Sequence, residues 1–135
     1  RYFNVYGERM SLEGAYCLVT GIFARQMKQG NPLTITNDGN QRRDFTYVGD
    51  VVQANILAAE YGDLLKGEVF NIGNGLNVSI NEVADMFGGQ KVYGEKRLEP
   101  FETLADNSKA KKILKWEPKG NLNRWIKNYK IKLGI

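Results

Sequence analysis

The sequence predicts an α/β fold, because short strand-like segments alternate with longer helix-like segments along its 135 residues. The strand-like segments are rich in aromatic and β-branched residues and are bounded by turn-forming residues. The helix-like segments carry apolar residues at every third or fourth position. With 42% hydrophobic and 25% charged residues, the composition matches an ordinary globular domain, so we treat residues 1–135 as one unit.

The first forty residues are predicted to form a strand, a helix and a second strand. Residues 2–6 are aromatic and β-branched, and Gly7 ends this strand. Residues 15–29 place apolar side chains at helical spacing. Residues 33–36 alternate as a strand does, and residues 37–40 have the composition of a turn.

The middle of the chain is predicted to hold two further strands and a helix. Residues 44–48 alternate polar and apolar side chains. Asp50 is a candidate N-cap for a helix over residues 51–60. Residues 69–72 form a compact apolar run that predicts a strand, which Gly73 ends.

The last part of the chain is predicted to be mainly helical. Ser79 and Glu82 have the spacing of a capping box, and apolar residues follow at helical spacing up to residue 87. Residues 91–93 predict a short strand. Two further helices are expected, one from Ser108 and one over residues 122–129.

The composition excludes several kinds of active site. The chain contains no histidine, which rules out Ser-His-Asp and Cys-His pairs and histidine metal sites. Cys17 is the only cysteine, so no intrachain disulfide or thiolate metal cage can form. We therefore predict no metal site, and we expect a cytoplasmic, reducing environment.

The net charge of +4 is unevenly distributed. Residues 1–90 carry 7 basic and 10 acidic groups, whereas residues 91–135 carry 12 basic and 5 acidic groups, which raises the question of nucleic-acid binding. Most of these lysines fall between apolar positions at helical spacing, as on a solvated helix face. We therefore expect no nucleic-acid partner, and the shortness of the apolar runs predicts no membrane partner.

The glycine-bearing turns do not match a known cofactor loop. Gly73-Asn74-Gly75 follows a predicted strand, but Val78 stands where G-x-G-x-x-G requires its third glycine. A tight turn is the simpler interpretation. None of the seven tyrosines is followed by lysine four residues later, so no Tyr-x-x-x-Lys pair is present and no catalytic residue is predicted.

Four segments, in order along the chain, together resemble the extended short-chain dehydrogenase/reductase family. They correspond to its R-Y-F-N-V-Y-G, R-D-F-x-Y-V-D-D-V-V, Y-N-I-G and A-D-x-S-K-A … G-W-x-P motifs. In this sequence they are residues 1–7, 41–52, 69–73 and 104–118. Gly49 departs from the second motif, which usually has aspartate there.

The resemblance implies the C-terminal, substrate-binding portion of an NAD-dependent nucleotide-sugar epimerase or dehydratase, without the N-terminal Rossmann half. Gly14-Ala15-Tyr16 makes the chain most similar to UDP-glucose or UDP-N-acetylglucosamine 4-epimerases. We expect a UDP-sugar ligand, NAD only in a longer parent protein, and no activity from this chain alone. The alternatives are a dehydratase or epimerase of dTDP-, GDP- or ADP-sugars, or a stand-alone, non-catalytic nucleotide-binding module.

The resemblance also implies roles for individual residues. Arg43 and Asn4 correspond to the arginine and asparagine that bind the substrate phosphates, and Phe45 would lie beside the nucleotide. As alternatives, Arg43 could form a surface ion pair with Asp44 or Asp50, and Asn4 could cap a turn.

The resemblance implies further contacts with the nucleotide. The backbone amides at Leu18 and Val19 are candidates for binding the pyrophosphate and base, and the strand containing Thr34 and Thr36 is a candidate for lining the uracil. Plain packing would explain these four residues equally well.

A second cationic clamp is expected near residue 97, where the family's R-x-G-D becomes Lys96-Arg97-Leu98-Glu99. Either Lys96 or Arg97 takes the place of the arginine, and Glu99 takes that of the acid that meets the ribose hydroxyls. Tyr2 and Phe3 correspond to cofactor-binding positions. Because the chain begins within a strand-like run without methionine, we expect a piece of a longer protein whose exposed apolar surface causes self-association.

Overall fold

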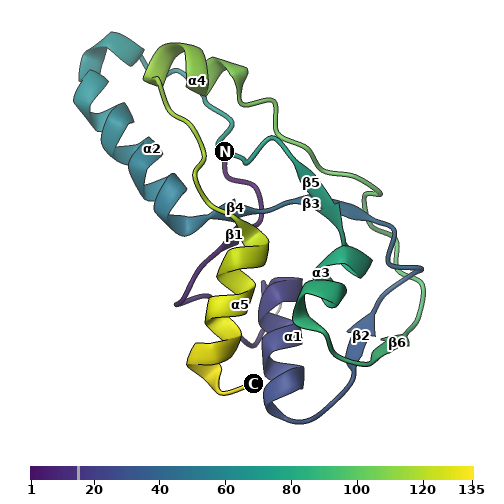
Figure 1. The fold of residues 1–135 in the computed structure, drawn as a ribbon. Helices are drawn as coiled ribbons and strands as arrows, with labels where there is room; N and C mark the ends of the chain where they lie inside the picture. The colour runs from purple at the N-terminus through teal and green to yellow at the C-terminus, as the bar shows by residue number, and fades with distance from the viewer. Residues whose placement is uncertain (15) are drawn as a thin grey trace.

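Strands and helices alternate along the chain in the computed structural model, which describes residues 1–14 and 16–135, and this confirms the predicted α/β class (Figure 1). None of the helices in this part of the chain is long and apolar enough to cross a bilayer. The elements are, in order, β1 (Val5–Tyr6), α1 (Val19–Lys28), β2 (Leu33–Ile35), β3 (Arg42–Asp44), β4 (Thr46–Tyr47), α2 (Val48–Tyr61), the 3-10 helix η1 (Gly62–Leu65), β5 (Asn77–Ser79), α3 (Ile80–Phe87), β6 (Lys91–Tyr93), α4 (Ser108–Leu114) and α5 (Leu122–Leu133).

Within residues 1–14 and 16–135, the strands form three separate two-stranded ladders. β1 pairs in parallel with β4, and β2 pairs in parallel with β6, with Leu33 opposite Lys91. β3 pairs antiparallel with β5, with Arg43 opposite Val78. Because two-stranded ladders are marginally stable in water, packing of side chains between the helices has to supply most of the stability.

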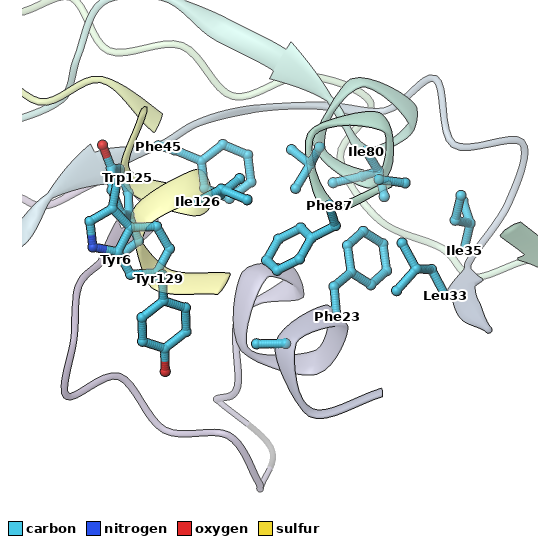
Figure 2. Packing of buried hydrophobic residues seen from close by; sticks show 13 residues of the cluster. Tyr6, Phe23, Leu33, Ile35, Phe45, Ile80, Phe87, Trp125, Ile126 and Tyr129 are labelled. Atoms are coloured by element: carbon cyan, nitrogen blue, oxygen red, sulfur yellow. The ribbon is translucent and has the colours of Figure 1, made fainter. Parts of the chain in front are cut away.

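In the part of the chain that the structure describes, two hydrophobic clusters provide this packing. The larger one joins α1, α3 and α5, and its buried aromatic rings include Phe23, Phe87 and Trp125 (Figure 2). Phe23 and Phe87 meet edge to face, with ring centroids 5.8 Å apart. The smaller cluster lies between α2 and α4 and contains Trp116, whose indole Nε1 donates a hydrogen bond of 2.8 Å to the carbonyl of Asp50.

The predictions for the second half of the chain are confirmed where the signal is local. The Ser79 hydroxyl accepts from the Glu82 amide at 3.1 Å, and the Glu82 carboxylate accepts from the Ser79 amide at 2.7 Å, so the capping box forms. The bond from the Ser79 amide is the main reason why the pKa of Glu82 lies below its usual range. The strand over residues 91–93 and the two last helices are also present.

The strands predicted over residues 2–6 and 69–72 are both wrong in extent. Residues 2–6 do not form one strand, because Asn4 has a φ of 36° and breaks the pairing. Tyr2 instead makes an isolated bridge with Ile72. Residues 69–72 form no strand beyond this bridge, in which the Ile72 amide donates to the Arg1 carbonyl at 2.8 Å.

Three other boundaries also differ from the prediction. The first helix starts at Val19 rather than at residue 15. Ala15, the middle residue of the Gly14-Ala15-Tyr16 motif, lies outside the described residues. Instead of one strand over residues 44–48, the structure has two: β3 ends at Asp44 and β4 begins at Thr46, with Phe45 between them. Helix α2 starts at Val48.

Asp50 is not the N-cap of α2, so that prediction is wrong. It lies in the first turn of the helix and is buried. Its carboxylate accepts hydrogen bonds from the amides of Lys119 and Gly120, at 3.0 and 2.8 Å. Asp50 therefore ties the segment before α5 to the start of α2.

Candidate functional site

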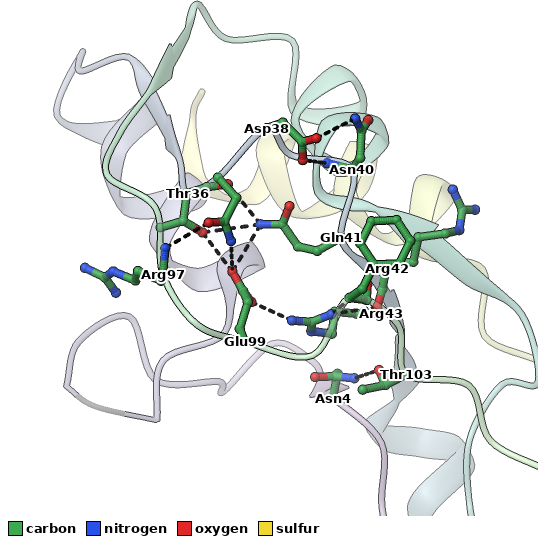
Figure 3. A network of polar contacts seen from close by, with 12 residues as sticks. Asn4, Thr36, Asp38, Asn40, Gln41, Arg42, Arg43, Arg97, Glu99 and Thr103 are labelled. Atoms are coloured by element: carbon green, nitrogen blue, oxygen red, sulfur yellow. Dashed lines mark hydrogen bonds and ion pairs between the residues drawn. The ribbon is translucent and has the colours of Figure 1, made fainter.

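Glu99 is the centre of a polar network that contains several of the predicted site residues (Figure 3). Its Oε1 accepts from the Thr36 hydroxyl at 3.2 Å, from Asn37 Nδ2 at 2.9 Å and from Gln41 Nε2 at 3.3 Å. Its Oε2 forms an ion pair with the guanidinium of Arg43. Turn residues after β2 and an arginine on β3 therefore converge on one carboxylate.

The guanidinium of Arg43 is largely enclosed, with 13% of its side chain exposed. Its Nη1 donates to the carbonyl of Arg42 at 2.8 Å and to that of Phe101 at 3.4 Å. The alternative ion pair with Asp44 or Asp50 is not what the structure shows, since Glu99 is the partner. An arginine fixed in this way presents a planar set of N–H donors of the kind that carboxylates and phosphates bind.

Asn4 lies beside the same strand. Its Nδ2 donates to the carbonyl of Asp44 at 2.8 Å and is 3.5 Å from the Thr103 hydroxyl. Figure 3 shows Asn4 and Thr103 next to the Arg43 backbone. The structure thus brings together the two residues for which the resemblance implies phosphate binding, and it also gives the Asn4 amide a hydrogen bond within the fold.

The other predicted substrate residues are more dispersed. Leu18 and Val19 are at the start of α1, packed against the larger hydrophobic cluster. Thr34 is exposed on β2 and contacts Gln26. Phe45 is only 4% exposed and packs within that cluster, so its ring contributes mainly to the core.

The two candidates for the second clamp and the first cofactor position, Tyr2, are exposed, whereas Phe3 is half-buried. Lys96 and Arg97 are both exposed, and Figure 3 shows the Arg97 side chain pointing away from Glu99. The backbone amide of Arg97 donates to Asn37 Oδ1 at 2.8 Å. Tyr2 is 56% exposed and its hydroxyl donates to Asn55, whereas the amide of Phe3 donates to the Ile72 carbonyl.

The glycine turn after residue 72 does not fit a dinucleotide phosphate. The carboxylate of Asp44 already accepts from the amides of Asn74 and Gly75, at 2.8 and 2.9 Å, and from that of Ala105 at 3.0 Å. The donors that would bind a phosphate are therefore occupied by the protein itself. Within residues 1–14 and 16–135, no three cysteine or acidic side chains gather closely enough to ligate a metal ion.

A cavity of about 470 Å³ lies elsewhere, beside α5. Tyr6, Tyr47, Trp125 and Tyr129 are among its lining residues, and none of the predicted site residues is. Burial, followed by the charge of Asp50, raises the pKa of Tyr6, and burial also raises the pKa of Tyr47 and of Tyr129. These hydroxyls therefore stay protonated at neutral pH and do not serve as bases there.

Sequence reasoning misses three members of the polar network. It assigns Asn37 only to a turn, places Gln41 only within a motif, and does not single out Thr103. Asn37 has a φ of 56°, a backbone conformation that asparagine tolerates better than most residues, and this is the one local signal for it. The contacts of Gln41 and Thr103 depend on tertiary structure alone.

Comparison with known proteins adds independent information. Residues 1–73 match the model of the NAD dependent epimerase/dehydratase family. A curated relative, a putative UDP-glucose 4-epimerase from Methanocaldococcus jannaschii, is 38% identical over 94% of this chain. The chain spans 42% of that relative's length.

Solved structures give the same result at the level of the fold. A UDP-glucose 4-epimerase from Thermotoga maritima, solved with UDP-glucose, superposes on all of this chain with a TM-score of 0.86 and 37% identity. A UDP-glucuronic acid 4-epimerase from Bacillus cereus, solved with UDP-glucuronic acid and NAD, superposes on 99% of it with a TM-score of 0.87 and 32% identity. The chain covers 46% and 44% of those two proteins.

Proposed function

This chain belongs to the NAD dependent epimerase/dehydratase family, and from this premise we propose that it is the substrate-binding part of a UDP-sugar 4-epimerase. The relatives' names and the ligands of the solved neighbours support this proposal. Because the glycine turn is closed by Asp44, we assign NAD to the remainder of a longer protein. Residues 1–135 are then a single substrate-binding domain that is inactive without that remainder.

The observation that carries the proposal is the enclosed guanidinium of Arg43 beside Asn4. Removing a diphosphate from water requires cations and donors that compensate for its charge. Backbone carbonyl groups orient the guanidinium of Arg43. Lys96 and Arg97 lie on the chain segment whose later residues contact this guanidinium. In this proposal Arg43 binds the diphosphate, Asn4 supports it, and either Lys96 or Arg97 acts as the second clamp.

The chain is expected to bind UDP without catalysing epimerisation. At a UDP concentration of 100 times Kd, binding should stabilise the fold by about 2.7 kcal/mol, which a thermal-shift assay detects. Arg43→Met should weaken binding at least about tenfold, since a charge-assisted contact contributes roughly 1.5–3 kcal/mol. Isothermal titration calorimetry measures the affinity for UDP of the wild type and of the Arg43→Met variant. The same samples supplied with UDP-glucose and NAD should give no product.

A matched control is Arg124→Met, which removes an arginine on α5 that lies outside the polar network. It should leave the affinity for UDP unchanged. Parallel titrations of dTDP, GDP and ADP test the other nucleotide sugars. Lys96→Met and Arg97→Met show which of these two cations is the second clamp. Absence of UDP binding, or equal binding by the Arg43 and Arg124 variants, would refute the proposal.

We further propose that the isolated chain self-associates through the exposed apolar face of α2. Val48, Val52 and Ile56 recur every four residues on this helix and are 37–52% exposed. Exposed apolar patches of this kind favour association. Multi-angle light scattering should detect a dimer or larger species, and the pair Val52→Lys and Ile56→Lys should shift it to monomer. A wild-type monomer across the concentration range would contradict this.

A further inference from the structure

We infer that the cavity beside α5 is a binding site for a small organic carboxylate with a flat apolar ring. This inference does not depend on the proposed function, because none of the residues predicted for the UDP site lines the cavity. The volume of about 470 Å³ lies in the range of sites that bind small molecules. Three features of the lining define the class of ligand: fixed aromatic walls, acidic groups that are already bonded, and exposed cations.

The walls are aromatic rings that hold one another in place. Tyr6 on β1 and Tyr129 on α5 both pack against Trp125 (Figure 2). The rings of Tyr6 and Trp125 meet edge to face with centroids 4.9 Å apart, and those of Trp125 and Tyr129 stack at 4.6 Å. These residues are at most 8% exposed, so the wall is formed before a ligand arrives. A preformed aromatic wall suits a flat apolar ring.

The acidic groups of the lining are already bonded within the protein. Both oxygens of Asp50 accept from backbone amides, at 3.0 and 2.8 Å. One oxygen of Glu8 accepts from the indole Nε1 of Trp125 at 3.0 Å. A ligand that donates hydrogen bonds would have to compete with these donors, whereas a ligand that accepts them would not.

The cations of the lining are, by contrast, exposed. Arg124, Asn128 and Lys132 recur every four residues on α5, so they share one face of this helix, and Lys119 lies just before it. Within residues 1–14 and 16–135, none of these three cations takes part in an ion pair. Their N–H groups are donors of the kind that a carboxylate accepts from.

The charges of the lining favour a ligand with a single negative charge. Three cations, Lys119, Arg124 and Lys132, and two carboxylates, Glu8 and Asp50, leave an excess of one positive charge. One ligand carboxylate balances this excess, whereas each further negative charge is repelled by the two carboxylates without a cation to match it. A nucleoside diphosphate therefore suits this cavity less well than a monocarboxylate does.

Calorimetric titration with 2-naphthoate, a flat apolar ring system with one carboxylate, tests the inference. We expect a dissociation constant of about 1 mM or lower. The uncharged 2-naphthamide lacks the group that the cations bind, and acetate lacks the ring, so each should bind at least about fivefold more weakly. Saturating UDP should leave the affinity for 2-naphthoate unchanged.

Two substitutions on α5 should weaken the binding of 2-naphthoate. Arg124→Met removes one cation and should lower the affinity at least about threefold. Asn128→Trp places a larger side chain where the ligand would lie and should lower the affinity at least about tenfold. Both positions are exposed, so both variants should fold, and an unchanged midpoint of urea denaturation checks this.

The matched control is Lys127→Met, which removes an exposed cation of the same helix that does not line the cavity. It should leave the affinity for 2-naphthoate unchanged. The inference would be overturned if the wild type bound no 2-naphthoate, bound 2-naphthamide equally well, or released 2-naphthoate when UDP was added. Equal affinities of the Arg124 and Lys127 variants, or full binding by a folded Asn128 variant, would also overturn it.

Discussion

Replacing Asp44 with alanine is expected to lower the free energy of unfolding by about 3 kcal/mol or more, the largest single effect that we predict. The side chain is fully buried, and its two oxygens accept from three backbone amides. These amides belong to Asn74, Gly75 and Ala105, so one carboxylate on β3 joins this strand to two distant segments of the chain. Alanine would leave all three donors without an acceptor, the Ala105 amide fully buried and the Asn74 and Gly75 amides partly buried, and each unsatisfied donor is costly.

Urea denaturation followed by tryptophan fluorescence measures this loss. Asp44→Asn should be intermediate, because its single oxygen can serve the two amides at Oδ2 while its amide nitrogen faces the Asn74 amide. The matched control is Asp85→Ala, an exposed aspartate paired with Lys91, whose loss should cost less than about 1 kcal/mol. Equal midpoints for the Asp44 and Asp85 variants would show that the three-amide contact does not stabilise the fold.

Local signals in the sequence predict the helices better than the strands. Helix α3 has both a capping box and an unbroken apolar stripe, and each is encoded within a short stretch of chain. The strand at residues 2–6 has a suitable composition, but Asn4 takes a left-handed conformation that composition does not reveal. Asp50 shows the same limit, because a carboxylate near a helix start can cap the helix or, as here, bind amides about 70 residues away.

The candidate site is predictable only where a motif or a charge marks it. The motif around residue 43 singles out the arginine, and the family pattern near residue 97 singles out Glu99. Nothing local indicates that these two pair with each other, because 56 residues separate them. The neutral donors that hold Glu99, among them Gln41, are ordinary polar residues whose partners only the tertiary fold supplies.

Gly73→Ala is expected to destabilise the chain by up to about 3 kcal/mol, at the upper end of the range for overpacking. A Cβ at this position would lie 2.3 Å from the Cβ of Ala105 and 3.0 Å from Asp44 Oδ2. Neither side chain can move away easily, because one is a methyl group fixed to the backbone and the other is tied to three amides. The glycine is therefore required by a close approach of two chain segments and not by a cofactor phosphate.

The compensating change Ala105→Gly distinguishes this cause from a general intolerance of the turn. In the double variant the clash is removed, so the loss should be clearly smaller than the sum of the two single losses, with a coupling of about 1 kcal/mol or more in a double-mutant cycle. Gly94→Ala is the control, because a Cβ there would approach only the Ile35 carbonyl, at an ordinary 3.8 Å. Additive effects in the cycle would mean that Gly73 is needed for its backbone freedom, and the steric account would be wrong.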